Sequence, residues 1–395
     1  MMSKAITKNI NTILAKVRQL RRELIRKREK PIKLPSDAIV VDFPPAEEVH
    51  KRLHEVARRI AEQILNEENP YFEIPRRSSD NVIYDPEVDM ILMRKSCARR
   101  ELLNLKSVRK ATITMRVLEI IHELLEQNIH ATKREVFYCD VALFKKQRES
   151  DEALEDIAAM LHCHRTALHV VAAAKGAVIG RLRFREGGDL IDCTKMGTGG
   201  KAITPFLDTI RDIDSDAEFI LLVEKDAAFL RLAEDKFWEK YPCIIITGKG
   251  FADIATREFL KLLVRELKLP VFGLVDADPY GMSILLVYAV GAKRTSYETP
   301  FLAVRDIKWL GLRPTDFEKY DLPKWARLRM TDKDVKRGVE LMKEPFLKER
   351  PKWMEELKIM LQTKEKAEIQ ALASRGLRFL TQVYLPTKLE TGDWI

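Results

Sequence analysis

The sequence predicts a multidomain protein, with an α+β winged-helix domain followed by an α/β domain built on a mostly parallel sheet. Apolar runs at residues 219–223, 243–247 and 271–275 alternate with helical patterns, as strands and helices do in α/β folds. From residue 94 to 177 the apolar spacing instead fits three helices. A hairpin that alternates apolar and basic residues follows, and three helices with such a hairpin outline a winged helix.

Length and composition fit a folded protein. The 395 residues suffice for two or three domains, and 46% hydrophobic with 33% charged residues argues against global disorder. The net charge of +9 suits a polyanionic partner, although it also favours solubility. We expect no membrane span and no signal peptide, because no apolar run is long enough. The Arg-rich, acid-poor start could alternatively be a mitochondrial transit peptide.

Cysteines and histidines give no clear metal motif. The cysteines at positions 97, 139, 163, 193 and 243 form no CxxC pair and are odd in number, which fits a reducing compartment. His162, Cys163 and His164 are adjacent, so on a helix they would point in different directions, and a solvent-facing or DNA-facing position is expected rather than zinc binding. His50 and His54 share a helical face but lack the glutamate of a zincin motif, and no function is assigned to them.

Residues 1–90 are expected to form an N-terminal extension. Residues 3–30 predict a basic helix with one apolar stripe, suited to docking on a partner or lying across DNA. The stripe consists of Ile6, Ile10, Ile13, Val17, Leu20 and Leu24. A linker that starts at Pro31 and ends at Pro45 follows. Residues 47–66 resume the helical period, and residues 69–89 have no regular period.

Residues 91–192 are expected to form the winged-helix domain. Its three longer helices are predicted at 110–127, 151–161 and 165–175, the last one stopped by Gly176, and a short helix is predicted around Tyr138. From the last helix, the residues expected to face DNA are Arg165, Thr166 and His169. From the hairpin at 177–191, acting as the wing, they are Arg181, Arg183 and Arg185. The alternative is a solvated cationic face, but alternation along one strand favours phosphate contact.

The helix around Tyr138 carries a possible nucleophile. Thr132 and Glu135 have the spacing of a capping box, which places the helix start at this point. Arg134 and Tyr138 are four residues apart and share a face. A tyrosine hydroxyl can attack a phosphate that a guanidinium group holds. An aromatic residue in the first turn of a small helical domain is more often core or surface, so both interpretations stay open.

The α/β domain, expected at 193–395, has acids where two strands end. Glu224 follows the strand at 219–223, and Asp276 and Asp278 follow the strand at 271–275. The carboxyl ends of parallel strands form the ligand-binding edge of such sheets, and two residues two apart on a strand point the same way. Three converging carboxylates cannot all stay ionised without a cation, and hard oxygen ligands suit Mg²⁺. The alternative is that these acids cap helices.

Two further segments of this domain are informative. Residues 247–250, Thr-Gly-Lys-Gly, lack the spacing of a phosphate-binding P-loop, so ATP binding there is rejected, but Lys249 is placed to touch phosphate. Beyond Thr331, charged helices interrupted by Pro345 and Pro351 are expected to wrap the sheet or to face a twin copy of the chain.

Taken together, the segments resemble the family of topoisomerase VI A subunits, which includes the meiotic sporulation protein eleven type that makes programmed double-strand breaks. The matching segments, in the family's order, are Thr132-Lys-Arg-Glu-Val-Phe-Tyr138, Ala173-Ala-Lys-Gly176, Val223-Glu-Lys-Asp226, Thr247-Gly-Lys-Gly250 and Val275-Asp-Ala-Asp-Pro279. The last two are closer in wording to the eukaryotic meiotic branch than to archaeal proteins of the family. Phe137 stands where many relatives have a first tyrosine, whereas the family's nucleophile is the second position.

The resemblance implies a winged-helix (CAP-like) DNA-binding domain followed by a Toprim domain. It makes Tyr138 the nucleophile and Arg134 its phosphate-binding neighbour. The implied magnesium ligands are Glu224, Asp276 and Asp278. The DNA-binding candidates are Lys133, Arg165, Thr166, His169, Lys175, Arg181, Arg183 and Lys249. In such proteins the tyrosine of one protomer meets the metal site of the other, so a homodimer on double-stranded DNA is implied.

The expected activity is a nuclear one, in which meiotic DNA double-strand breaks form and the protein stays linked to the 5′ ends. Because no ATPase motif is present, any energy-driven step would need a partner such as a B-subunit-like protein, expected at the N-terminal helix. One alternative is the A subunit of an ATP-coupled type II topoisomerase that cuts and reseals DNA. Another is a non-catalytic winged-helix DNA-binding module.

Overall fold

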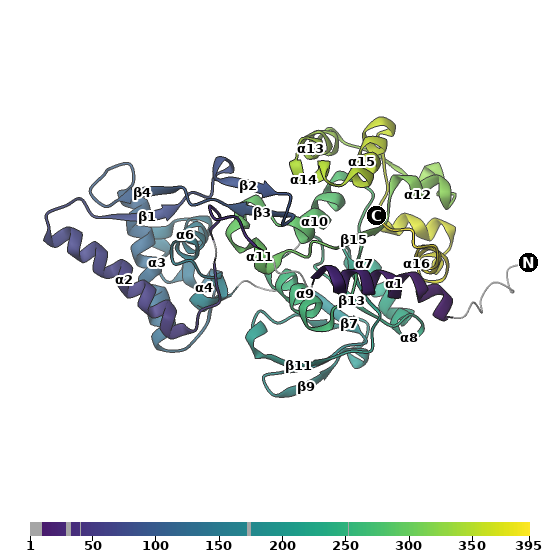
Figure 1. Ribbon diagram of the computed structural model, residues 1–395, viewed down its shortest axis with the longest axis horizontal. Helices are drawn as coiled ribbons and strands as arrows, with labels where there is room; N and C mark the ends of the chain where they lie inside the picture. Colours follow the sequence, from purple (N-terminus) through teal and green to yellow (C-terminus); the bar gives the residue numbers. More distant parts are fainter. Residues whose placement is uncertain (1–9, 29–32, 40, 172–174, 252) are drawn as a thin grey trace, which may run out of the picture.

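The computed structural model describes residues 10–28, 33–39, 41–171, 175–251 and 253–395, and it shows two domains side by side (Figure 1). Ile6, Pro31 and Ala173, which belong to the segments predicted above, lie outside these residues. Among the helices that are described, none combines the length and the apolar character that a membrane span requires.

The first domain is a helical bundle with short strands at its edge. Its main helices are α2 (Ala46–Leu65), α3 (Val108–Glu126) and α6 (Gln147–Met160), with the short α4 (Lys133–Tyr138) and α5 (Val141–Phe144) between α3 and α6. Two strand pairs flank them, β1 (Tyr71–Pro75) with β4 (Cys97–Glu101) and β5 (Ala131–Thr132) with β6 (Val170–Val171). Apolar residues from all three main helices share one core, as their spacing predicted. A hairpin of β2 (Val82–Asp85) and β3 (Met90–Met93) lies toward the second domain (Figure 1).

The prediction of a last helix at residues 165–175 of this domain is wrong. Residues 165–168 form one 3₁₀ turn, η2 (Arg165–Leu168), which ends where His169 takes a left-handed conformation with a φ of 55°. The chain then enters β6 directly. No long DNA-facing helix therefore starts at Arg165.

The predicted wing belongs to the other domain. β8 (Arg183–Glu186) and β9 (Asp189–Asp192) pair as predicted, but β8 also pairs with β11 (Ile210–Asp214), and β7 (Ala177–Gly180) joins the large sheet. Leu182 and Phe184 of this segment pack into the α/β core. The boundary between the domains therefore lies between residues 171 and 177, rather than at 192.

The second domain confirms the predicted α/β fold. Its six-stranded sheet has the order β10-β7-β13-β12-β14-β15, and the four strands from β13 to β15 are parallel. These are β12 (Phe219–Val223), β13 (Cys243–Thr247), β14 (Val271–Leu274) and β15 (Lys308–Gly311), beside the antiparallel β7 and β10 (Lys201–Ala202). Successive residues of β12 enter two different cores, one on each face of the sheet.

Helices cover both faces of this sheet. One core contains α9 (Ile254–Leu267) and α10 (Pro279–Val290), and the other contains α1 (Ile10–Arg28), α7 (Asp226–Glu234) and α16 (Leu385–Thr391). The later helix α13 (Asp332–Met342) packs beside α10, and α15 (Pro351–Thr363) packs beside α13, so this part of the chain wraps the sheet. This sandwich leaves the carboxyl edge of the parallel strands for a site.

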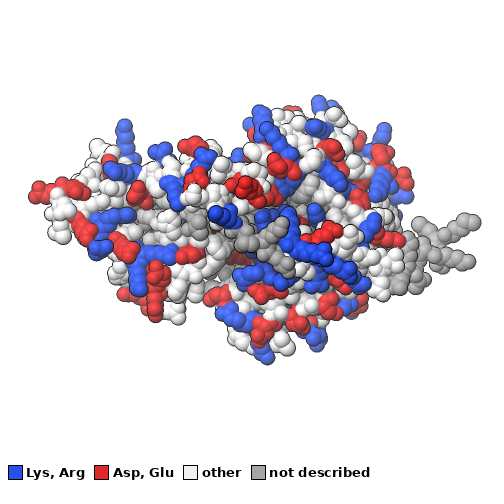
Figure 2. Space-filling model, viewed as in Figure 1, with Lys and Arg blue, Asp and Glu red and all other residues white. Residues whose placement is uncertain are grey.

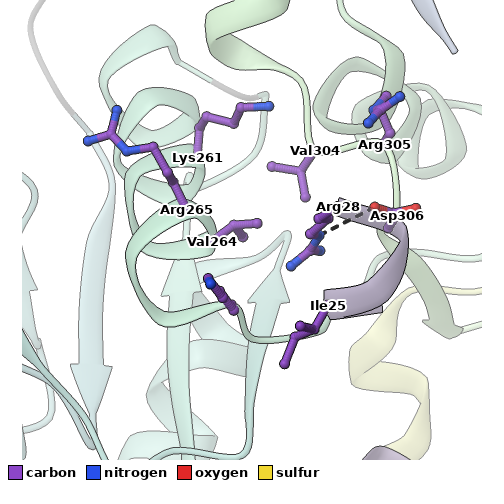
Figure 3. A pocket seen from close by; sticks show the side chains of 9 residues that line it. Ile25, Arg28, Lys261, Val264, Arg265, Val304, Arg305 and Asp306 are labelled. Atoms are coloured by element: carbon purple, nitrogen blue, oxygen red, sulfur yellow. Dashed lines mark hydrogen bonds and ion pairs between the residues drawn. The ribbon is translucent and has the colours of Figure 1, made fainter. Parts of the chain in front are cut away.

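The apolar stripe of α1 is covered by the chain itself, so this stripe is not the surface that docks on a partner. Ile13, Val17, Leu20 and Leu24 are buried against the α/β domain, where α1 lies beside α16. At the end of α1, Arg28 pairs with Asp306 at 3.4 Å, and both residues line a pocket of about 340 Å³ beside α9 (Figure 3). The charged face of α1 stays exposed, and blue side chains gather along it in Figure 2.

The two domains meet through buried charges. Arg165 of η2 donates from its backbone N–H to Glu298 Oε1 at 3.1 Å and from Nη2 to Oε2 at 3.3 Å. Glu298 ends η5 (Lys293–Glu298) in the second domain, and His164 Nε2 lies 2.8 Å from Glu258 Oε1. Arg165 is only 3% exposed, and His164 and Cys163 are fully buried. The predictions of a DNA contact for Arg165 and an outward-facing position for His164 and Cys163 are therefore wrong.

Replacing Glu298 with glutamine is expected to destabilise the protein by about 3–5 kcal/mol, because Arg165 would stay buried without its counter-charge. Urea denaturation measures this loss. The control is Glu62→Gln, which removes a surface pair with Arg58 at 3.1 Å and should cost less than about 1 kcal/mol. Similar losses for the two variants would contradict a buried ionic interface.

Candidate active site

The tyrosine helix α4 starts with the predicted capping box. The Thr132 hydroxyl accepts a hydrogen bond from Glu135 N at 3.2 Å, and Glu135 Oε2 accepts one from Thr132 N at 2.6 Å. Val136 is fully buried and anchors the helix in the core of the first domain. This anchoring fixes the direction of the residues on the opposite face.

Tyr138 and Arg134 lie on that opposite face and point to solvent. Tyr138 is 68% exposed, with the Phe137 ring edge-on at 5.4 Å between centroids. Arg134 is also exposed, and among the described residues none pairs with its guanidinium group. The hydroxyl and the cation are therefore both available to a ligand that approaches from outside the chain.

The three predicted acids lie together at the carboxyl edge of the sheet. Glu224 follows β12, and Asp276 and Asp278 follow β14, which is the parallel neighbour of β12. Glu224 Oε2 accepts a hydrogen bond from Asp276 N at 2.8 Å. Asp278 Oδ1 accepts one from Gly281 N at 2.7 Å and so caps α10. The helix-cap alternative thus describes Asp278, but not Glu224 or Asp276.

The negative charges of this acid cluster are only partly balanced by the nearby Lys225. Burial, followed by the charges of Asp276 and Asp278, raises the pKa of Glu224 to about 7. Burial also raises the pKa of Asp276 and of Asp278, although Lys225 Nζ lies 2.8 Å from Asp276 Oδ2 and opposes the shift there. A divalent cation would supply the missing charge and let the carboxylates ionise.

The donor set fits magnesium. All three side chains offer hard oxygen ligands, which Mg²⁺ prefers. Among the described residues, only a group of three histidines in the first domain has one possible ligand atom from each residue within 4.8 Å of the others. The carboxylate oxygens of the three acids are therefore more widely spaced than the atoms of that group. Mg²⁺ keeps several waters and binds through one or two carboxylates, so this wider spacing suits a hydrated ion. The magnesium role of Glu224, Asp276 and Asp278 stays a prediction.

Two residues of this cluster were not predicted from the sequence. Lys225 lies between Asp276 and Glu368, at 2.8 and 2.7 Å from their oxygens. Gly281 has no room for a side chain, because a Cβ there would lie 2.4 Å from the Asp276 carbonyl oxygen and 3.1 Å from Glu224 Oε2. The available signals were a lysine directly after Glu224 and a glycine three residues after Asp278.

Replacing Gly281 with alanine is expected to weaken Mg²⁺ binding at least about tenfold, because the methyl group would displace the Asp276 backbone and Glu224. Isothermal titration calorimetry with Mg²⁺ checks this. Gly199→Ala is the matched control, since a Cβ at Gly199 meets nothing within 4 Å. Unchanged Mg²⁺ affinity in Gly281→Ala would separate this turn from metal binding.

The DNA-binding candidates do not form one surface. Four of the cations form ion pairs with acids of the same chain, which are Lys133 with Asp151 at 3.6 Å, Lys249 with Asp226 at 3.3 Å, Arg181 with Asp216 at 2.6 Å and Arg183 with Asp192 at 3.3 Å. The Thr166 hydroxyl lies within hydrogen-bonding distance of His164 Nδ1, at 2.8 Å. His169 stacks on His130, and Lys175 is exposed. Arg181 and Arg183 belong to the second domain, so they cannot extend a DNA face of the first. Contacts of the remaining candidates with DNA stay predictions.

Tyr138 and the acids lie on different domains of the chain. α4 belongs to the helical domain, whereas α10 and the acid cluster belong to the α/β domain (Figure 1). The structure therefore brings the acids together and leaves the tyrosine exposed, which suits a site completed from outside the chain.

Known proteins match both domains in sequence. Residues 219–389 match the model for the Toprim domain of the topoisomerase 6 A-subunit/Spo11 family, and residues 109–170 match the model described as type IIB DNA topoisomerase. The chain is 52% identical to the A subunit of DNA topoisomerase 6 from Arabidopsis thaliana, over 88% of this chain and 81% of that protein.

Two further relatives are more distant. Meiotic recombination protein SPO11-1 of Oryza sativa subsp. indica is 41% identical over 72% of this chain and 75% of its own length. The A subunit of type 2 DNA topoisomerase 6 from Aeropyrum pernix is 37% identical over 89% and 95%. The family expected from the motifs is thereby confirmed, and the chain belongs to the topoisomerase 6 A-subunit/Spo11 family.

Proposed function

We propose that this protein is a topoisomerase-like transesterase that makes meiotic DNA double-strand breaks, leaves itself covalently linked to the 5′ ends and so initiates homologous recombination. The observation that carries the proposal is the exposed pair of Tyr138 and Arg134 on a capped helix, in a chain whose other domain gathers three acids. Membership of the family supports the DNA-cleaving chemistry.

The chemistry uses groups of this chain. Arg134 binds the phosphate, and the Tyr138 oxygen attacks the phosphorus in line. The Tyr138 hydroxyl loses its proton as its oxygen bonds to phosphorus, the bond to the 3′ oxygen breaks, and the 3′ oxygen takes up a proton and leaves as a hydroxyl. One phosphodiester replaces another, so the step needs no ATP. Mg²⁺ held by Glu224, Asp276 and Asp278 would stabilise the charge that develops on the leaving oxygen.

We propose that two copies act together on duplex DNA in the nucleus. Because Tyr138 and the acids sit on separate domains, the tyrosine of one copy would meet the acids of the other. A B-subunit-like or other accessory protein would bind the exposed charged face of α1, since its apolar stripe is already covered.

The test incubates purified protein with end-labelled duplex DNA and Mg²⁺, and then denatures the protein. Protein should remain attached to newly cut ends and block digestion by a 5′ exonuclease but not by a 3′ exonuclease. Attachment at 3′ ends would contradict the proposed direction of attack.

A second candidate is the A subunit of an ATP-coupled type II topoisomerase, which cuts and reseals. It is favoured by the 52% identity to a plant topoisomerase protein, against 41% to a plant meiotic protein. ATP-dependent relaxation of supercoiled DNA by the chain with a co-purifying ATPase would support this candidate. Breaks that persist after ATP addition would support the meiotic function.

A further inference from the structure

Three histidines from two helices converge in the first domain, away from the acid cluster. His50 and His54 lie one turn apart on α2, and His122 lies on the neighbouring α3. His122 Nδ1 is 3.1 Å from His50 Nε2, and the three ring centroids are 4.8–5.4 Å apart. One ligand nitrogen from each ring lies within 4.8 Å of the other two. Among the described residues, no other group of three histidine, cysteine or acidic side chains comes this close together.

The spacing of these nitrogens fits a transition metal ion. Zinc binds imidazole nitrogen at about 2.0–2.1 Å, so two nitrogens of a tetrahedral site lie about 3.3 Å apart. The contact of 3.1 Å between His50 and His122 is close to that value, and a nitrogen of His54 lies within 4.8 Å of both. The His-x₃-His spacing on α2 also lies in the range that zinc sites use.

A carboxylate orients the third ring. Glu126 Oε1 lies 3.4 Å from His122 Nε2, one turn along α3. Carboxylates commonly hold the far nitrogen of a metal-binding histidine in this way, which leaves Nδ1 of His122 to face the other two rings. A hydrogen bond between His50 and His122 explains one contact, but it does not explain why a third imidazole converges on the same point.

We propose that His50, His54 and His122 bind one zinc-class divalent ion, with one nitrogen from each residue and an open fourth position. Imidazole ligands favour Zn²⁺, Ni²⁺ or Cu²⁺ over the hard Mg²⁺ that suits the acid cluster. The ion joins α2 to α3, the helix that directly precedes the tyrosine helix α4. The site therefore ties the N-terminal part of the chain to the tyrosine domain.

The test titrates the full chain, without a histidine tag, with Co²⁺ followed by visible absorption and with Zn²⁺ followed by calorimetry. With millimolar Mg²⁺ present to occupy the acid cluster, we expect one Co²⁺ or Zn²⁺ ion per chain, and a rise of about 2–8 °C in Tm when Zn²⁺ is in large excess over its Kd. Millimolar Mg²⁺ should not displace Co²⁺. Glu224→Gln should bind Co²⁺ like the unchanged protein, which separates this site from the acid cluster.

His54→Asn is the decisive variant, because His54 is exposed and its loss should leave the fold intact. We expect at least a tenfold loss of Co²⁺ affinity and no rise in Tm with Zn²⁺. His130→Asn is the matched control, since His130 stacks on His169 outside this group and should leave Co²⁺ binding unchanged. Equal Co²⁺ affinity in His54→Asn and the unchanged protein, or displacement of Co²⁺ by Mg²⁺, would overturn the proposal.

Discussion

Tyr138→Phe is expected to lower covalent attachment of the protein to DNA ends by about 10⁴-fold or more, because no other group can take over the role of a lost nucleophile. The substitution removes one oxygen from a side chain that is 68% exposed, and it keeps the ring that contacts Phe137. Tm and DNA affinity should therefore stay unchanged. The measurement is the yield of protein-linked 5′ ends after denaturation.

The matched control is Tyr71→Phe, which removes the same oxygen from another tyrosine of the first domain. The Tyr71 ring lies under Arg99 at 4.5 Å and keeps this contact as phenylalanine. This control should cleave normally. If Tyr138→Phe still becomes linked to DNA, the nucleophile is another residue. If the unchanged protein binds DNA and never becomes linked, the non-catalytic module is the better description.

The features that the sequence predicted correctly depend on residues that are close together in the sequence. The capping box of Thr132 and Glu135 fixes the start of α4 through hydrogen bonds between residues three apart, so spacing alone reveals it. The acids follow apolar runs that indicate buried strands, and parallel strands bring their carboxyl ends to one edge. Both parts of the candidate site were therefore predictable before any contact between distant segments was known.

The errors concern contacts between distant segments. Alternation in residues 177–192 shows a hairpin but not its partner strand, which is β11 of the second domain. Arginine is a residue type that often contacts DNA, but Arg165 pairs with Glu298, which lies 133 residues later in the sequence. His122 likewise meets His50 from 72 residues away, so the spacing of His50 and His54 alone could not indicate a third ligand. The apolar stripe of α1 likewise packs against α16, which lies near the other end of the sequence.

Glu224→Gln is expected to abolish Mg²⁺-dependent cleavage and yet to stabilise the metal-free protein at pH 8. Burial, followed by the charges of Asp276 and Asp278, raises the pKa of Glu224 from 4.5 to about 7, so the folded state favours the protonated form. The stabilising contribution of Glu224 is therefore fully present below about pH 4.5 and is lost as the pH rises through 7. Glutamine stays neutral at every pH and can still accept the hydrogen bond from Asp276 N.

The expected gain at pH 8 is about 1–3 kcal/mol, since one pKa unit corresponds to about 1.4 kcal/mol and solvent screens part of the effect. Thermal unfolding in EDTA at pH 5 and pH 8 measures it, and the gain should shrink at pH 5, where Glu224 is protonated in the unchanged protein. Added Mg²⁺ should then stabilise the unchanged protein at pH 8 but not Glu224→Gln, because metal binding needs the ionised carboxylate. Glu340→Gln, in a surface pair with Arg337 at 3.7 Å, should change neither result. A Glu224→Gln protein that is less stable at pH 8, or that Mg²⁺ still stabilises, would mean that Glu224 does not hold the ion.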